Sequence, residues 1–304
     1  MREKWRYHLF LFAVCWIWGL AFIAMKVLLD EVSFITLNLV RFLLSSLFLL
    51  PLVAAGWRRR PRLSVGEWTL VFLAGIAAAY GYHLAITYGE TMVPAGTAGL
   101  VANITPVFAA VLSRLILYES LGAWKAAGIA MALGGVAVIA VFGGEELGAG
   151  RVRGVLFILL AAFSWALYTV ILKPLAQERG AFFISAYAIF LGTAALLPLG
   201  LTGGGFVAEV KVLSAAGWAW MLFLSLGCTV LGYFLYAKGL EGLGASLSAF
   251  YIYLIAPIAL FWGWLILGEA LNAAVLAGTA MILAGLVSVG WEERKAYSGP
   301  GSSP

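Results

Sequence analysis

Residues that could bind metals or form disulfides are scarce in this 304-residue sequence. It has two histidines, two cysteines and 14 acidic residues, among which Asp30 is the sole aspartate. Protein metal sites usually need three or four such ligands brought together, so we expect neither a metal nor another cofactor. Cys15 and Cys228 both lie in apolar stretches, where an isolated thiol commonly packs as a small hydrophobic side chain. No disulfide framework is predicted.

Charged residues are also rare, and their rarity excludes an ordinary soluble domain. They make up 11% of the chain against 63% apolar residues, and the mean hydropathy is +1.02, whereas about 25% of a soluble domain is charged. A helix needs about 20 apolar residues to cross a bilayer. The sequence therefore predicts an all-α membrane protein with ten transmembrane helices. They cover residues 8–29, 33–54, 68–88, 96–117, 123–142, 152–172, 182–201, 216–236, 245–266 and 273–291.

The net charge of +5 comes from basic residues that gather in alternate short loops. Cytoplasmic loops carry an excess of Lys and Arg, so the richer side is predicted to be cytoplasmic, with both termini on it. We therefore expect a multi-pass protein of the inner or plasma membrane that binds no nucleic acid. The poorer side holds Arg151, Arg153 and Lys211, and the richer side holds Arg2, Lys4, Arg6, Arg58, Arg59, Arg60, Arg62, Arg114, Lys125, Lys173, Arg179, Lys238, Arg294 and Lys295.

The two halves of the chain repeat the same landmark residues at a nearly constant spacing. Trp18, Lys26, Pro51, Pro106 and Glu119 recur 147 to 151 residues later as Trp165, Lys173, Pro198, Pro257 and Glu269. Each half holds five apolar stretches, and an odd number turns the second half upside down in the membrane, as in transporters with inverted repeats. We predict a first repeat over 1–145, an inverted second repeat over 146–292 and a disordered cytoplasmic tail over 293–304.

The combination of these landmarks carries a family resemblance. It rests on Trp18-Gly19, on Arg41 within residues 39–44, and on the duplicated proline and glutamate pair. The sequence resembles the EamA family of the drug/metabolite transporter superfamily over essentially its whole length. The resemblance implies a ten-helix fold with pseudo-twofold symmetry and a central cavity that exports small metabolites such as amino acids. The second half has Ala188 in place of Arg41, so the role of Arg41 is not duplicated.

Pro106 and Pro257 lie in corresponding apolar stretches and should interrupt both helices. Each proline removes the backbone hydrogen bond to the carbonyl four residues earlier, at Ala102 and Tyr253. Matched interruptions in two repeats indicate a transporter's binding site, whereas a simple packing kink is the alternative. The symmetric pairing favours a functional role.

Several polar or aromatic side chains lie too deep in their stretches to be interfacial anchors. His83 is the foremost candidate for a cavity wall, because an ionisable group at that depth needs a cavity or a partner; the alternative is a neutral imidazole bonded to a neighbouring tyrosine. Trp18 and Trp165 lie near the bilayer midplane, where they either line the cavity or pack between helices. The predicted substrate-cavity residues are Trp18, Tyr82, His83, Asn103, Trp165, Tyr168 and Tyr253.

Three basic residues in the apolar stretches have open roles. Arg41 either binds an anionic substrate or anchors backbone carbonyls. Lys26 and Lys173 are expected to extend to the interface. Glu119 and Glu269 are expected to cap helices. Small residues recur in the helices that follow them, and we expect these to allow close packing within the chain or between copies; they lie at positions 128, 132 and 135 and at 274, 278 and 285.

These features predict a secondary transporter working by alternating access around a midplane cavity. The expected cargo is an apolar or aromatic amino acid or a related amphiphile, exported down its gradient or with protons coupled through His83. One alternative is a multidrug exporter, and another is a carrier of anions such as phosphorylated sugars that uses Arg41, Lys26 and Lys173. An enzyme would need a nucleophile with a base or paired acids, and a channel a ring of charge; neither is visible. The expected partners are a small-molecule substrate and the bilayer, for a monomer or weak homodimer.

Overall fold

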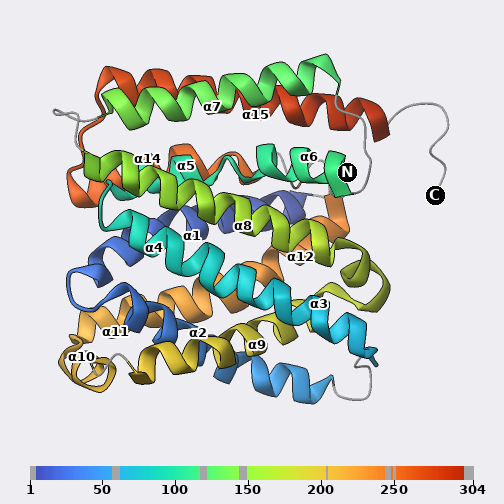
Figure 1. The fold of residues 1–304 in the computed structure, drawn as a ribbon, viewed down its shortest axis with the longest axis vertical. Helices are drawn as coiled ribbons and strands as arrows, with labels where there is room; N and C mark the ends of the chain where they lie inside the picture. Colours follow the sequence, from blue (N-terminus) through green and yellow to red (C-terminus); the bar gives the residue numbers. More distant parts are fainter. Residues whose placement is uncertain are drawn as a thin grey trace.

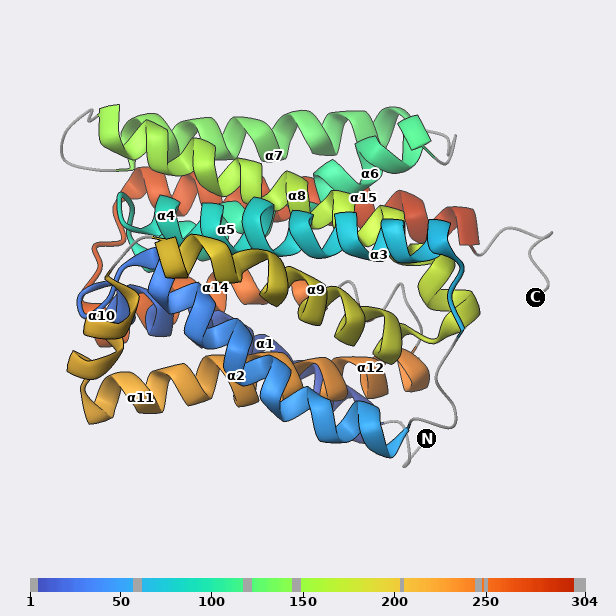
Figure 2. The same ribbon diagram turned by 60° about the horizontal axis from the view of Figure 1, so that its bottom comes forward.

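The computed structural model describes residues 5–56, 62–116, 122–143, 149–202, 205–243, 248 and 251–297, and these form helices and short connections without a β-strand. Figures 1 and 2 show the helices packed side by side. Their bounds are α1 (Trp5–Leu29), α2 (Phe34–Ala55), α3 (Val65–Ile76), α4 (Ala85–Glu90), α5 (Ala95–Ala102), α6 (Thr105–Ile116), α7 (Ala123–Phe142), α8 (Ala149–Arg179), α9 (Ala181–Thr202), α10 (Phe206–Val212), α11 (Ala215–Leu222), α12 (Gly232–Leu243), α14 (Ile255–Leu267) and α15 (Ala273–Tyr297), with π-helices η2 (Ala77–Leu84) and η3 (Phe223–Leu231).

The predicted all-helical membrane architecture is confirmed. Within the described residues, eight helical segments are long and apolar enough to cross a membrane, and two shorter apolar helices, Ile255–Leu267 and Ala273–Ser288, follow them. The described residues of each predicted stretch lie in helices or in the short breaks between them. One difference is at the end, where α15 runs to Tyr297, past the predicted end of the second repeat at residue 292. Residues 298–304 of the predicted tail lie outside the described part.

The helices are irregular at matching places in the two halves. The third stretch contains η2 between α3 and α4, and the eighth contains η3 between α11 and α12. The fourth is broken at residues 103–104, just before Pro106, and the ninth at residues 253–254, just before Pro257. The breaks therefore fall where the two prolines predict them. π-Helical turns free backbone groups and often lie at functional sites.

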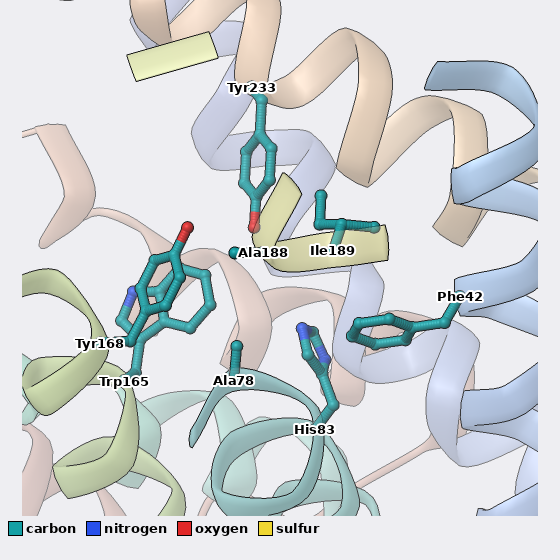
Figure 3. Close-up of a pocket in the computed structure, with 8 residues that line it drawn as sticks. All are labelled: Phe42, Ala78, His83, Trp165, Tyr168, Ala188, Ile189 and Tyr233. Atoms are coloured by element: carbon teal, nitrogen blue, oxygen red, sulfur yellow. The ribbon is translucent and has the colours of Figure 1, made fainter. Parts of the chain in front are cut away.

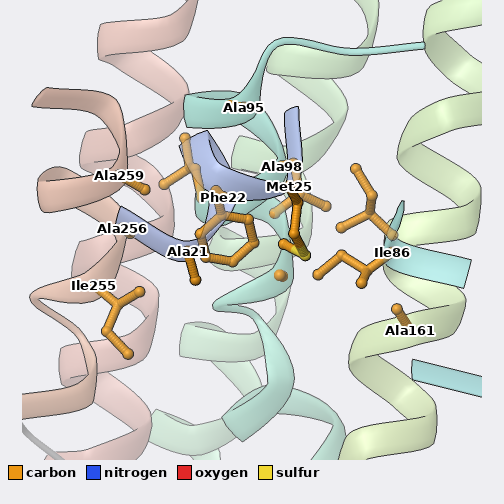
Figure 4. Close-up of a cluster of buried hydrophobic side chains, with 14 of the residues drawn as sticks. Ala21, Phe22, Met25, Ile86, Ala95, Ala98, Ala161, Ile255, Ala256 and Ala259 are labelled. Carbon is orange, nitrogen blue, oxygen red and sulfur yellow. The ribbon is translucent and has the colours of Figure 1, made fainter. Parts of the chain in front are cut away.

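Figure 4 shows the core where α1 meets the two broken helices. Phe22 and Met25 of α1 lie among small residues of α5 and α14. A Cβ added at Gly99 would lie 2.5 Å from the Cβ of Ala259, so α5 and α14 approach almost to backbone contact. Small residues permit such close packing between membrane helices. The two breaks are thus fixed beside each other at the centre of the bundle.

α7 and α15 form one edge of the molecule and pack along each other (Figure 1). A Cβ added at Gly135 would lie 2.6 Å from the carbonyl oxygen of Gly278, and one added at Gly285 would lie 2.5 Å from that of Gly128. The prediction of close approach is confirmed, and the small residues serve packing within the chain.

Two reciprocal contacts join the connections at one end of the bundle, where α10 lies (Figure 2). Ser214 donates its backbone N–H and hydroxyl to the carboxylate of Glu31, at 2.8 and 2.7 Å. Ser33 donates the same two groups to Glu209, both at 2.8 Å. Each serine is also the N-cap of a helix, α11 or α2. We call these contacts the serine latch; α1 begins and α15 ends at the opposite end of the bundle.

Candidate functional site

Two small adjoining pockets lie between the halves of the chain. Each has room for about one water molecule. They share a wall formed by Phe42, His83, Ile189 and Tyr233. The aromatic pocket, shown in Figure 3, adds Ala78, Trp165, Tyr168 and Ala188. The basic pocket adds Arg41, Ser45 and Thr229. Both π-helices therefore contribute side chains, His83 from η2 and Thr229 from η3.

Trp165 and Tyr168 form the aromatic side of the site. They lie three residues apart on α8, so they share one helix face, and their rings stack at 4.9 Å with an angle of 24°. Tyr82 does not line either pocket, but its ring packs on Trp165 at 4.8 Å. Figure 3 shows the hydroxyl of Tyr233 pointing towards the space beside this pair.

His83 lies at the junction of the two pockets. It is 8% exposed, and its ring meets Phe42 and Tyr82 edge-on at 4.9 and 4.8 Å. Its Nδ1 atom is buried and has no hydrogen-bond partner among the described residues. The predicted alternative, an imidazole hydrogen-bonded to a neighbouring tyrosine, is not what the structure places here. His83 instead presents an unpaired nitrogen within the site.

Arg41 brings a buried positive charge to the basic pocket. Its side chain is 8% exposed, and no described carboxylate lies within 4.0 Å of its guanidinium. Its side-chain contact is a long one, 3.8 Å from a guanidinium nitrogen to Sδ of Met25, and a thioether is a weak acceptor. One turn later on α2, the hydroxyl of Ser45 is buried without a partner among the described residues.

Trp18, Asn103 and Tyr253 are placed outside both pockets. The indole N–H of Trp18 donates to the carbonyl of Cys228 in η3 at 2.9 Å, and its ring packs on Tyr233 and Tyr236. Trp18 therefore satisfies a backbone group of the π-helix and packs between helices.

Asn103 joins the two helix breaks. Its side-chain amide donates to the carbonyls of Ile252 and Tyr253, at 3.1 and 3.4 Å. The carbonyl of Tyr253 is the one that Pro257 leaves without its helical partner. Its counterpart in the first half, the carbonyl of Ala102, accepts from the hydroxyl of Thr105 at 2.8 Å. Neighbouring groups thus satisfy both carbonyls that the prolines leave free, as expected if the kinks serve packing.

The three basic residues of the anion alternative do not converge, because only Arg41 lines a pocket. The ammonium of Lys26 reaches the end of α4, where it donates to the carbonyls of Glu90 and Val93, at 2.7 and 3.0 Å. Backbone carbonyls are available there because the helix ends at Glu90. Lys173 is exposed near the end of α8.

Two acidic residues have surroundings that the sequence did not indicate. Glu90 is the last residue of α4, but its side chain is fully buried, and neither carboxyl oxygen has a hydrogen-bond partner among the described residues. Glu269 does cap a helix, yet it caps α5 of the other half, where Ala95 and Gly96 donate their backbone N–H groups to it. Asn272 caps the helix that follows Glu269. Glu119 lies outside the described residues.

Sequence reasoning missed Ser45, Thr229 and Tyr233. Serine, threonine and tyrosine are common in membrane helices, where they bond to a carbonyl of their own helix, as Thr229 does to Leu224. The available signals were positional: Ser45 lies one turn after Arg41, and Thr229 lies 146 residues after His83.

Comparison with known proteins agrees with this architecture. The EamA-like transporter family matches the chain twice, over residues 5–141 and 152–291. A probable terminal-alkyne amino-acid exporter of Streptantibioticus cattleyicolor is 32% identical, over 90% of this chain and 89% of that protein. A probable amino-acid metabolite efflux pump of Salmonella typhimurium is 28% identical, over 89% and 90%. A solved crystal structure with 21% identity superposes with a TM-score of 0.63 over 96% of this chain and 99% of that one. The chain belongs to the EamA-like transporter family.

Proposed function

We propose that this transporter exports amino acids or closely related amphiphilic metabolites across the inner or plasma membrane. The observation that carries the proposal is the pair of adjoining pockets, with a buried guanidinium at one end and stacked aromatic rings at the other. An amino acid with an apolar side chain has the same two-part character. The names of the relatives from Streptantibioticus and Salmonella support an amino-acid cargo.

We further propose ten spans in two inverted repeats, over residues 1–145 and 146–292, with both termini cytoplasmic. Support comes from the two successive family matches and from the matching π-helices and breaks of the two halves. Five spans in each half reverse the second half in the membrane. The excess of basic residues on one side favours the cytoplasmic termini.

Alternating access is the transport mechanism that best suits this arrangement. Each pocket has room for about one water molecule, so a cargo must be admitted and released through movement of the helices around them. With cytoplasmic termini, the serine latch lies at the outer end of the bundle. Export then requires its four hydrogen bonds to Glu31 and Glu209 to break when the outer side opens.

Counterflow into proteoliposomes tests the proposed cargo. Vesicles are loaded with one unlabelled amino acid at a time, and uptake of a labelled amino-acid mixture is measured for the wild type and for Trp165→Ala. Aromatic pairs contribute about 0.5–1.5 kcal/mol each, so loss of Trp165 should weaken uptake about tenfold.

The matched control is Trp264→Ala, because Trp264 is 53% exposed on the outer face of α14 and should leave uptake unchanged. Failure of folded wild-type protein to exchange any amino acid would refute the proposed cargo. Equal losses in the two variants would refute the assignment of the pocket.

A further inference from the structure

We infer that Arg41, together with Ser45 and His83, forms the subsite that binds the carboxylate of the exported molecule. The inference rests on the proposed function and adds to it a chemical requirement, a free carboxylate on the cargo. It assigns a specificity-determining role to Arg41 and divides the site into an acid-binding end and an aromatic end.

The first step is the missing counter-ion of Arg41. A guanidinium stays charged in proteins, and a charge within a membrane span is expensive unless it is paired. Arg41 is buried, has no described carboxylate within 4.0 Å, and contacts a thioether at 3.8 Å. By contrast, the exposed Arg179 pairs with Glu67 at 3.0 Å. The unpaired guanidinium of Arg41 is therefore best neutralised by an anion that binds during transport and is then released.

The second step is the presence of two more unpaired polar atoms at the same pocket. The hydroxyl of Ser45 and Nδ1 of His83 are buried and lack hydrogen-bond partners among the described residues. Buried polar groups are normally paired. A carboxylate offers two oxygens with about four acceptor positions and can accept a guanidinium bidentately. One such group can satisfy Arg41 and Ser45 together, whereas a water molecule would leave the positive charge unbalanced.

The third step is the polarity of the site as a whole. The positive charge of Arg41 lies at one end of the site only. The equivalent position of the second half, 147 residues later on α9, is the uncharged Ala188, which lines the aromatic pocket. Trp165 and Tyr168 line the same pocket as Ala188. A molecule with its carboxylate on Arg41 directs its side chain across Phe42 and His83 towards the aromatic pair. An amine without a carboxylate meets repulsion from Arg41 and gains no compensating contact.

The test compares phenylalanine with its amide and with phenethylamine as competitors of labelled phenylalanine in the counterflow assay. Wild type should prefer phenylalanine by about ten- to hundredfold, because hydrogen bonds to charged groups are the strong ones. Arg41→Gln should lose most of this preference, Arg41→Lys should retain part of it, and Ser45→Ala should reduce it by a smaller factor. Arg153→Gln is the matched control, because Arg153 is exposed near the start of α8.

The ratio between acid and amide separates recognition from a merely structural role, because a damaged fold lowers both equally. Thermal stabilisation of the purified protein by phenylalanine and by its amide gives the same ratio without transport, and it reports on any variant that is folded but inactive.

If wild type exchanges acid and amide equally, or if Arg41→Gln keeps the full preference, the inference is wrong and the proposed function stands. If no amino acid is exchanged but acetate or lactate stabilises wild type and not Arg41→Gln, the subsite stands and the proposed cargo fails. If neither carboxylate nor amino acid produces an Arg41-dependent effect, the inference is overturned.

Discussion

Glu269 links the two halves of the chain, and its removal should measurably weaken the fold. Its carboxylate accepts the backbone N–H groups of Ala95 and Gly96, at 2.5 and 2.8 Å. These residues begin α5, so the carboxylate lies where the N–H groups of a helix lack partners within the helix. A contact 173 residues apart in sequence therefore fixes the start of a broken helix beside the pocket-forming bundle.

The expected size of the effect follows from the bonds that are lost. Hydrogen bonds to a charged group contribute about 1.5–3 kcal/mol each, and a negative charge at a helix N-terminus adds about 0.3–1 kcal/mol. The carboxylate is part-buried, so we take values near the lower limits. Glu269→Ala should lower the free energy of unfolding by about 3 kcal/mol, and Glu269→Gln, which keeps one acceptor, by about half as much.

Thermal unfolding of the purified protein in detergent checks this expectation. At about 2 °C per kcal/mol for a chain of this size, Tm should fall by about 6 °C for Glu269→Ala and about 3 °C for Glu269→Gln. Glu178→Gln is the control, because Glu178 is exposed at the end of α8. An unchanged Tm for Glu269→Ala would show that the cap contributes nothing. An equal loss for both variants would show that the charge, and not the hydrogen bonds, carries the effect.

Two further predictions concern the packed edge and the serine latch. Gly278→Val should prevent normal packing of α7 against α15, because even a Cβ there would lie 2.4 Å from a side-chain carbon of Ile139. The yield of monodisperse protein should therefore fall sharply. Gly66 has open space around it, so the control variant Gly66→Val should purify normally. Burial raises the pKa of Glu209, but hydrogen bonds from Ser33 and Thr36 outweigh it and set the pKa below the usual 4.5. A lowered folded pKa gives stability that is present above pH 4.5 and lost as the pH falls through the folded value. The Tm of Glu209→Gln should therefore lie below wild type at neutral pH and approach it in acid, and a constant difference at all pH values would contradict the latch contact.

The positions of the helices were largely predictable, because each physical requirement leaves a mark in the sequence. A span needs about 20 apolar residues, and a proline cannot donate the hydrogen bond that would continue a helix. The breaks before Pro106 and Pro257 followed from these requirements. The π-helices did not, because their turns depend on long-range packing such as the approach of Gly81 to Ser164, where an added Cβ would lie 2.4 Å from the serine hydroxyl.

The members of the site were less predictable than the helices. His83, Trp165 and Tyr168 were found by the rule that polar or aromatic groups deep in a span need a cavity or a partner. The same rule selected Trp18 and Asn103, which instead donate to the backbone carbonyls of Cys228 and of Ile252. Partners more than 140 residues away in sequence decide between these outcomes. The rule identifies side chains that need a partner, and only the fold shows whether a backbone group supplies it.

Equivalent positions of the two halves face the same site, and their differences determine its chemistry. Arg41 and Phe42 of α2 and Ala188 and Ile189 of α9, 147 residues apart, all line the pockets. A second arginine at Ala188 would place two guanidinium groups around one small space, and their repulsion would favour a cargo with two negative charges. A single arginine opposite alanine suits one carboxylate and leaves the other end apolar. The repeated π-helices thus contribute to both pockets, whereas the unrepeated arginine would give the proposed cargo a direction.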